Sequence, residues 1–177
     1  AARRLVWVAP SARSGGRCRV NLSSRAPNLP NQGWGGSRDH RQAFSSAFAW
    51  SSTGCDLTTG GEARYASGLW VSGEFFNTLG VRPIAGRVLT AADDRRGCTA
   101  PPAVISYGFW QREYGGNPSA IGRSVMLDGH AYDIIGITPP AFFGVEVGRS
   151  YDVPVPPCAE PLSRAQRSGL DQPDPWL

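Results

Sequence analysis

The sequence contains no lysine, because all 18 of its basic residues are arginines, and its formal net charge is +4. These arginines are scattered, with no run longer than a pair, whereas nucleic-acid-binding domains gather basic residues on one face. A Walker-type phosphate loop needs a lysine, and the glycine pairs of this chain are isolated. We therefore expect this chain to bind neither nucleic acid nor ATP.

Long hydrophobic runs are also missing. A membrane-spanning helix needs about 20 apolar residues, but the longest apolar stretch, Ile134 to Val145, contains Pro139 and Pro140. The chain begins with two arginines among its first residues but has no apolar core of signal-peptide length there. We expect that this chain does not itself span the membrane and that any targeting element lies outside it.

Residues that hold metals are few. The chain has two histidines and four cysteines, at positions 18, 55, 98 and 158, and their spacing matches no zinc-binding pair. The cysteines could form two disulfides in three connectivities, or none, which leaves the redox compartment open. Adjacent carboxylates occur only at Asp93 and Asp94, in a polar loop that we expect to be solvated. We predict no metal and no cofactor.

One set of residues could serve a serine hydrolase. The Gly-x-Ser-x-Gly motif is absent, but Ser106 stands between a predicted strand and a predicted helix, and Asp128, His130 and Asp133 follow it. The chemical interpretation is a small esterase-like enzyme with Ser106 as nucleophile, His130 as base and Asp133 or Asp128 as the acid. The alternative interpretation is that Ser106 caps the helix and that His130 lies in solvent beside a turn. We favour the second interpretation and predict no catalytic residues.

Glycine and proline are abundant, at 22 and 15 residues, which leaves little room for long helices. Asp128-Gly129 between two apolar-bearing runs is typical of a two-residue β-hairpin, because both central positions of a type I′ turn need a positive φ. Periodicity and turn residues predict strands at 62–72, 103–105, 124–127, 130–135 and 152–155, helices at 38–50, 74–79 and 107–114, and a helical turn at 118–122. This pattern predicts an α+β fold in which a mixed sheet of short strands combines with short helices and one Asp-Gly hairpin.

Five ordered blocks resemble a known family. The first reads Phe75-Phe76-Asn77-Thr78-Leu79-Gly80-Val81-Arg82-Pro83 within residues 71–87, and the others cover 103–118, 121–129, 132–139 and 152–156. Their order and spacing are similar to the MacB-like periplasmic core domain, although Pro154 stands where that family has a tryptophan. The likeness is looser at Arg4-Leu5-Val6 and at 38–51, and residues 10–36 depart from the pattern.

The resemblance implies a MacB periplasmic-domain-like fold and a division of the chain into three parts. Residues 1–36 would be an irregular N-terminal segment, 37–162 the core domain, and 163–177 a polar C-terminal tail. It further implies the extracytoplasmic domain of an FtsX-like ABC transporter permease, of the duplicated type found in acidobacteria and related soil bacteria. Such a domain lies at the periplasmic or extracytoplasmic face of the inner membrane, as part of a membrane protein.

The implied mechanism is mechanotransmission without catalysis. The partners would be the rest of the permease and its cytoplasmic ATPase, together with a periplasmic partner protein or exported substrate. Two alternatives stay open: the free-standing hydrolase built on Ser106, and a dimerising module, which an exposed apolar patch would indicate.

Overall fold

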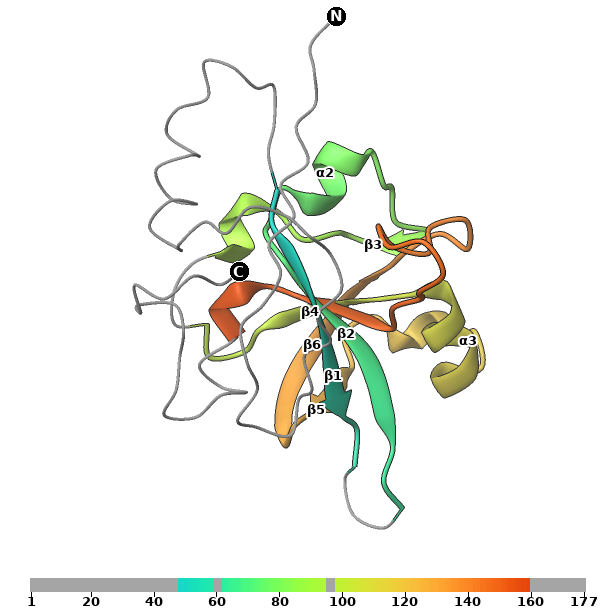
Figure 1. Cartoon of the computed structure of the whole chain (residues 1–177). Coiled ribbons are helices and arrows are strands. Elements are labelled where there is room, and N and C mark those ends of the chain that lie inside the picture. The colour runs from blue at the N-terminus through green and yellow to red at the C-terminus, as the bar shows by residue number, and fades with distance from the viewer. Residues whose placement is uncertain (1–47, 59–61, 95–97, 160–177) are drawn as a thin grey trace, which may run out of the picture.

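The computed structural model describes residues 48–58, 62–94 and 98–159. Their strands form two small sheets that meet in the middle of the molecule, and the two α-helices lie at its periphery (Figure 1). The predicted α+β class with mixed strand directions is confirmed, and the strands divide between two sheets rather than one.

The first sheet has three strands in the order β1-β2-β7. β1 (Trp50–Asp56) runs antiparallel to β2 (Tyr65–Val71), and β7 (Val153–Val155) runs parallel to β2 on the other side. Pro154 therefore sits in an edge strand, where its missing N–H removes no bond of a central ladder.

The second sheet is built around β6 (His130–Ile137), which has three neighbours. β5 (Ser124–Leu127) and the two-residue β3 (Ala85–Gly86) pair with it antiparallel, and β4 (Pro102–Ile105) pairs with it in parallel. The predicted turn between β5 and β6 is confirmed, since Asp128 and Gly129 have φ values of 52° and 81°. Asp and Gly tolerate that left-handed geometry, so the dipeptide fixes the register of this hairpin.

The two α-helices start and stop as their sequences predict. α3 (Tyr107–Tyr114) begins after Ser106, whose Oγ accepts a hydrogen bond from the Phe109 N–H at 3.1 Å. α2 (Phe75–Leu79) ends at Gly80, which has a φ of 71°. The other helical pieces of the described residues are single 3₁₀ turns, η2 (Ala91–Asp94), η3 (Pro118–Ala120) and η4 (Pro157–Ala159).

β2 separates two hydrophobic clusters, and this differs from the half-buried strand predicted for 62–72. Ala66 and Trp70 face a cluster made with the second sheet and α3, whereas Leu69 and Val71 face a cluster built around the phenylalanines of α2. The alternation of exposed and buried residues holds only at the start of β2, and from Gly68 onward every residue is buried. Both faces of this strand are covered because the two clusters pack from opposite sides.

The helix predicted at 38–50 is wrong at its C-terminal end. Phe48 and Ala49 have no helical structure and Trp50 begins β1, while residues 38–47 lie outside the described part. Phe44 and Phe48 are spaced as on a helix. The ring of Phe48 instead packs edge-on against that of Phe75, with 5.0 Å between the ring centroids. Within the described ranges, no helix is long and apolar enough to cross a membrane.

Candidate functional site

The hydrolase residues do not come together. β4 runs parallel to β6 with Ile105 opposite Ile137, so Ser106 lies where β6 ends, whereas His130 lies where β6 begins. The eight residues of β6 put about 23 Å between these two ends, at about 3.3 Å per residue. A nucleophile and its base must lie within hydrogen-bonding reach of each other, so the hydrolase hypothesis is wrong.

The serine and the two aspartates have structural roles instead, and the histidine lies at the surface. The Ser106 hydroxyl caps α3, and His130 is exposed at the hairpin. Asp133 Oδ1 accepts a hydrogen bond from Ser124 Oγ at 3.1 Å, across the β5–β6 pair. Asp128 Oδ1 accepts one from the Asp56 N–H at 3.0 Å, which ties the hairpin turn to the end of β1.

A disulfide joins Cys98 to Cys158, whose Cα atoms are 5.7 Å apart and whose sequence separation is 60. Sequence spacing had left the pairing open, and only the fold brings these two residues together. Of the other cysteines, Cys55 is buried in the core and Cys18 lies outside the described residues. Disulfides persist in oxidising compartments, so this pair favours an extracytoplasmic location.

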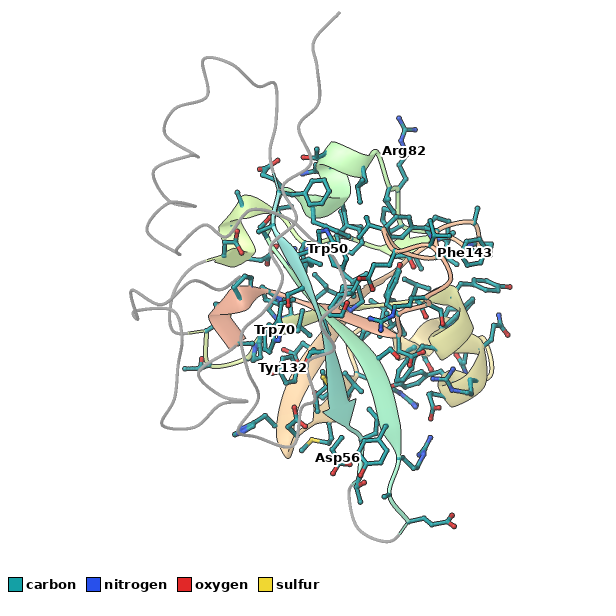
Figure 2. All side chains as sticks on the ribbon, viewed as in Figure 1. Trp50, Asp56, Trp70, Arg82, Tyr132 and Phe143 are labelled. Atoms are coloured by element: carbon teal, nitrogen blue, oxygen red, sulfur yellow. A yellow bond between two sulfur atoms is a disulfide. The ribbon has the colours of Figure 1, made fainter. Side chains whose placement is uncertain are left out.

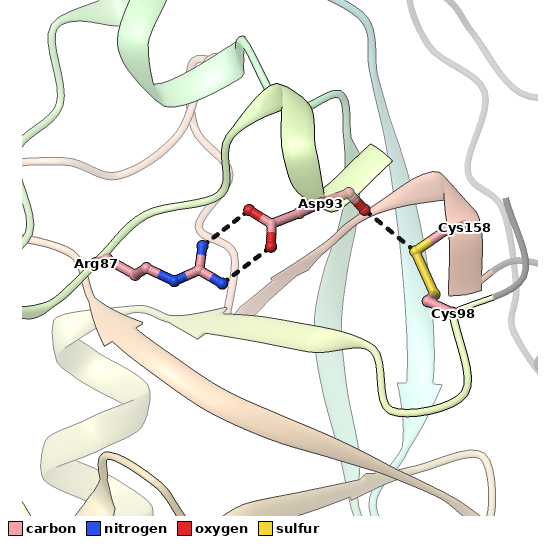
Figure 3. Close-up of a disulfide and its surroundings, with 4 residues drawn as sticks. All are labelled: Arg87, Asp93, Cys98 and Cys158. Carbon is pink, nitrogen blue, oxygen red and sulfur yellow. Dashed lines mark hydrogen bonds and ion pairs between the residues drawn. A yellow bond between two sulfur atoms is a disulfide. The ribbon is translucent and has the colours of Figure 1, made fainter. Parts of the chain in front are cut away.

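Polar groups pack around the disulfide (Figure 3). The Arg87 guanidinium donates two hydrogen bonds to Asp93, to Oδ2 at 2.8 Å and to Oδ1 at 2.9 Å, and the Thr90 N–H donates to Oδ2 at 2.8 Å. The carbonyl oxygen of Asp93 contacts Cys158 Sγ at 3.3 Å. Burial by itself would raise the pKa of Asp93, but the hydrogen bonds from Arg87 and Thr90 outweigh it and hold that pKa below its usual value.

The prediction that Asp93 and Asp94 lie in a solvated loop is therefore wrong for both aspartates. The side chain of Asp93 is only 11% exposed, and Asp94 Oδ2 accepts a hydrogen bond from the Gly73 N–H at 2.9 Å. These bonds hold η2 against the segment before α2. Charge alone predicted solvent exposure, but in the fold the carboxylates accept bonds that the loop backbone needs.

Of the first and last strands of the described part, β1 starts and β7 finishes at the same end of the first sheet. Ser51 near the start of β1 and Val155 at the end of β7 both lie opposite Trp70 of β2. They stand on either side of β2, so about 10 Å, or two strand spacings, separates them. A force on the chain before β1 or after β7 is therefore applied to the same three-stranded sheet.

The end of β7 is also fastened to the second sheet. The disulfide joins Cys158, just after β7, to Cys98, just before β4. At the other end of β7, the Ser106 N–H donates to the Asp152 carbonyl at 2.8 Å. The side chain of Asp152 accepts hydrogen bonds from the Ser67 N–H at 2.9 Å and from Arg112 at 3.0 Å. β7 is thus tied to β4 at both of its ends.

A cavity of about 310 Å³ lies over the face of β1 and β2 that carries Trp50, Ser52 and Leu69. Its other wall is the loop 143–151, which Glu146 holds in place by accepting hydrogen bonds from Ser52 Oγ at 3.2 Å and from Arg149 at 3.3 Å. Phe143 on the rim is 68% exposed, and it points away from the body of the molecule (Figure 2). The indole Nε1 of Trp50 is buried and has no hydrogen-bond partner among the residues that the structure describes.

Among the described residues, no group of three or more histidines, cysteines or carboxylates could hold a metal ion. The observed features define a class of protein: a disulfide-linked α+β domain whose first and last strands lie on either side of β2 in one sheet. The sequence model of the MacB-like periplasmic core domain matches residues 3–174, so the chain belongs to that family. It is a periplasmic-type, extracytoplasmic domain of an ABC transporter permease.

Solved structures agree with this assignment at the level of the fold. The periplasmic region of MacB from Actinobacillus actinomycetemcomitans matches with a TM-score of 0.57 and 15% identity over 85% of this chain. The extracellular domain of the noncanonic ABC-type transporter YknZ from Gram-positive bacteria matches with a TM-score of 0.52 and 16% identity over 73% of this chain. The matches cover 68% and 60% of those two chains. No curated protein sequence matches the chain.

Proposed function

We propose that this domain transmits movement of membrane helices to a partner protein or substrate outside the membrane and that it makes or breaks no bond itself. Its partners are the rest of the permease, a cytoplasmic ATPase, and a periplasmic protein or exported substrate. The permease is of the duplicated type of soil bacteria, with the core domain at 37–162 between an irregular segment, 1–36, and a polar tail, 163–177.

One observation supports this proposal: the start of β1 and the end of β7 lie at the same end of the first sheet, on either side of β2. Because Ser51 and Val155 flank Trp70, a relative displacement of the two connecting segments acts directly on β1 and β7. A sheet loaded in this way moves as a unit with its packed core, since protein interiors are close-packed and transmit strain.

The disulfide extends that displacement to the second sheet. A pull on the chain beyond η4 reaches Cys158 and passes through the covalent bond to Cys98 and β4. β4 begins at Pro102, which lies opposite Asp133 of β6, three residues from His130 at the β5–β6 hairpin. Movement of the chain beyond η4 is therefore relayed to this hairpin through about 10 Å of β6.

Hydrogen exchange in the full permease with its ATPase tests the proposal. We expect amide exchange in β1, β7 and β6 to differ between the nucleotide-free and ATP-bound states. In a Cys98→Ala/Cys158→Ala variant, the difference should remain in β1 and β7 but shrink in β6. Gly108→Ala, at an exposed position of α3, is the control that should leave the pattern unchanged. Identical exchange of this domain in both nucleotide states would refute the proposal.

A further inference from the structure

A series of ion pairs leads from α3 to the first sheet. Arg112 of α3 donates to Asp152 Oδ1 and to Glu113 Oε1, at 3.0 Å in each case. Glu113 also pairs with Arg64, which lies just before β2. The Arg112 guanidinium stands 5.3 Å from the ring centroid of Phe109, within the range of a cation–π contact. We call Arg64, Glu113, Arg112 and Asp152 the ion-pair chain.

Asp152 is the point where the ion-pair chain meets the first sheet. Its Oδ2 accepts a hydrogen bond from the Ser67 N–H of β2 at 2.9 Å, one residue before β7 begins. Its backbone N–H donates to Ser67 O at 2.6 Å, and its carbonyl oxygen accepts from the Ser106 N–H at 2.8 Å. Asp152 therefore bonds to β2, to the residue that caps α3, and to Arg112 within α3. The bonds made by its side chain can open while the backbone of both strands stays in place.

The charged groups of the ion-pair chain differ in exposure. The side chains of Glu113 and Asp152 are 16% and 19% exposed, whereas those of Arg64 and Arg112 are 59% and 53% exposed. The carboxylates are largely removed from water, which favours their pairing, because a buried charge without a partner is costly. The arginines stay in contact with water and dissolved ions, so the pairs can open and close. At the other end of β7, by contrast, Cys158 is held by a covalent bond.

We propose that the ion-pair chain is a reversible latch between α3 and the first sheet. When the latch is closed, α3 moves together with β2 and β7, and when it is open, α3 moves independently of them. β7 is thus coupled to its surroundings in two ways, through the latch at its start and through the disulfide after its end. The latch deepens the proposed function and rests on it, because the displacement that reaches α3 through Asp152 is the one that membrane helices apply to β7.

The Ser67 amide reports whether the latch is closed. In the 177-residue chain, its hydrogen exchange is compared with that of Gly68, which bonds to β1 on the other side of β2. Arg112→Gln should speed exchange at Ser67 about tenfold relative to Gly68, since the Asp152 carboxylate loses the guanidinium that orients it. Arg112→Lys keeps the charge and should recover part of the protection. Arg82→Gln is the matched control and should change nothing, because Arg82 is exposed and points away from the body of the molecule (Figure 2).

Salt provides a second test that changes no residue. At about 1 M sodium chloride the Debye length falls to about 3 Å, so exchange at Ser67 should rise about threefold relative to Gly68 in the wild type and stay unchanged in Arg112→Gln. Glutamine has nearly the helix propensity of arginine, so loss of α3 would not explain this difference. The latch is overturned if Ser67 is as protected in Arg112→Gln as in the wild type, or if salt speeds its exchange equally in both chains.

The full permease with its ATPase tests whether the latch couples α3 to the first sheet during transport. We expect exchange in α3 to differ between the nucleotide-free and ATP-bound states, and Arg112→Gln should abolish that difference while leaving the differences in β1 and β7. Unchanged exchange in α3, beside an ATP response in β1 and β7, would overturn the latch and leave the proposed function standing. If no part of the domain responds to ATP, the proposed function is refuted, and the salt test on the isolated chain still decides whether the pairs open.

Discussion

Removing the Cys98–Cys158 disulfide should lower the stability of this domain by about 4 kcal/mol. The bond closes a loop of 60 residues, and the loss of loop-closure entropy in the unfolded chain for that length corresponds to about 4 kcal/mol at 25 °C. For a domain of this size each kcal/mol shifts the melting temperature by about 4 °C, so the Cys98→Ala/Cys158→Ala variant should melt about 15 °C lower.

Thermal and urea unfolding of the 177-residue chain, followed by circular dichroism, measure this loss. The variant should also show a larger denaturant dependence, because its unfolded state is more expanded and exposes more surface. Wild type in dithiothreitol should unfold at nearly the temperature of the variant, since both lack the cross-link, and the variant should not respond to the reductant. A variant that melts within about 3 °C of the oxidised wild type would refute the reasoning.

Three further changes test the packing and the polar contacts. Gly136→Ala should destabilise the domain by about 2–4 kcal/mol, since a Cβ there would lie 1.9 Å from the Arg87 carbonyl oxygen, whereas Gly108→Ala in α3 meets no atom within 4 Å and should be neutral or stabilising. Ser106→Ala should cost about 1 kcal/mol in urea unfolding through loss of the helix cap, and Ser106→Thr should recover most of it. Because the pKa of folded Asp93 is lowered, its stabilisation is present above the unfolded pKa and is lost as pH falls through the folded value, so the wild type should lose more stability on acidification than Asp93→Asn.

Each of these predictions has an outcome that would contradict it. Equal melting temperatures for the two glycine variants would mean that the backbone at the end of β3 does not lie in close contact with β6 at Gly136. A Ser106→Ala chain that keeps its full stability would mean that the Ser106 hydroxyl does not stabilise the start of α3. Parallel acid-unfolding curves for wild type and Asp93→Asn would show that the hydrogen bonds from Arg87 and Thr90 do not shift that carboxylate.

Local signals predicted eight of the elements, each with its ends within three residues of those observed. Asp128-Gly129 fixed a hairpin because few residues accept a positive φ at both positions, and Ser106 and Gly80 mark a helix start and a helix stop by satisfying backbone groups within a few residues. The ordered blocks after Tyr65 identified the family, and the family model confirms it. Each of these signals depends on residues that are close together in the chain, so it can be recognised from the sequence alone.

β1 was missed because its sequence, Trp-Ser-Ser-Thr-Gly-Cys-Asp, is small and polar and resembles a loop. It is a strand because β2 pairs with all of its residues and Phe48 and Trp50 pack into the cluster around α2. The spacing of Phe44 and Phe48 favoured a helix, and tertiary packing overrode that preference. A strand of this kind is specified by its neighbours rather than by its own residues.

The sequence by itself determined the turns, the caps and the family of this protein, because each depends on residue types within a few positions. The tertiary structure alone decided that Cys98 pairs with Cys158, that Asp93 is held by Arg87 instead of lying in solvent, and that Ser106 and His130 lie at opposite ends of β6. The cysteine pair and the Ser106–His130 separation are distances between segments far apart in the chain, and the Arg87–Asp93 contact depends on how the loop between them folds. They follow only from strand pairing and from the hydrophobic clusters that pack on the two faces of β2. The same strand pairing places the start of β1 and the end of β7 at the same end of one sheet, on either side of β2.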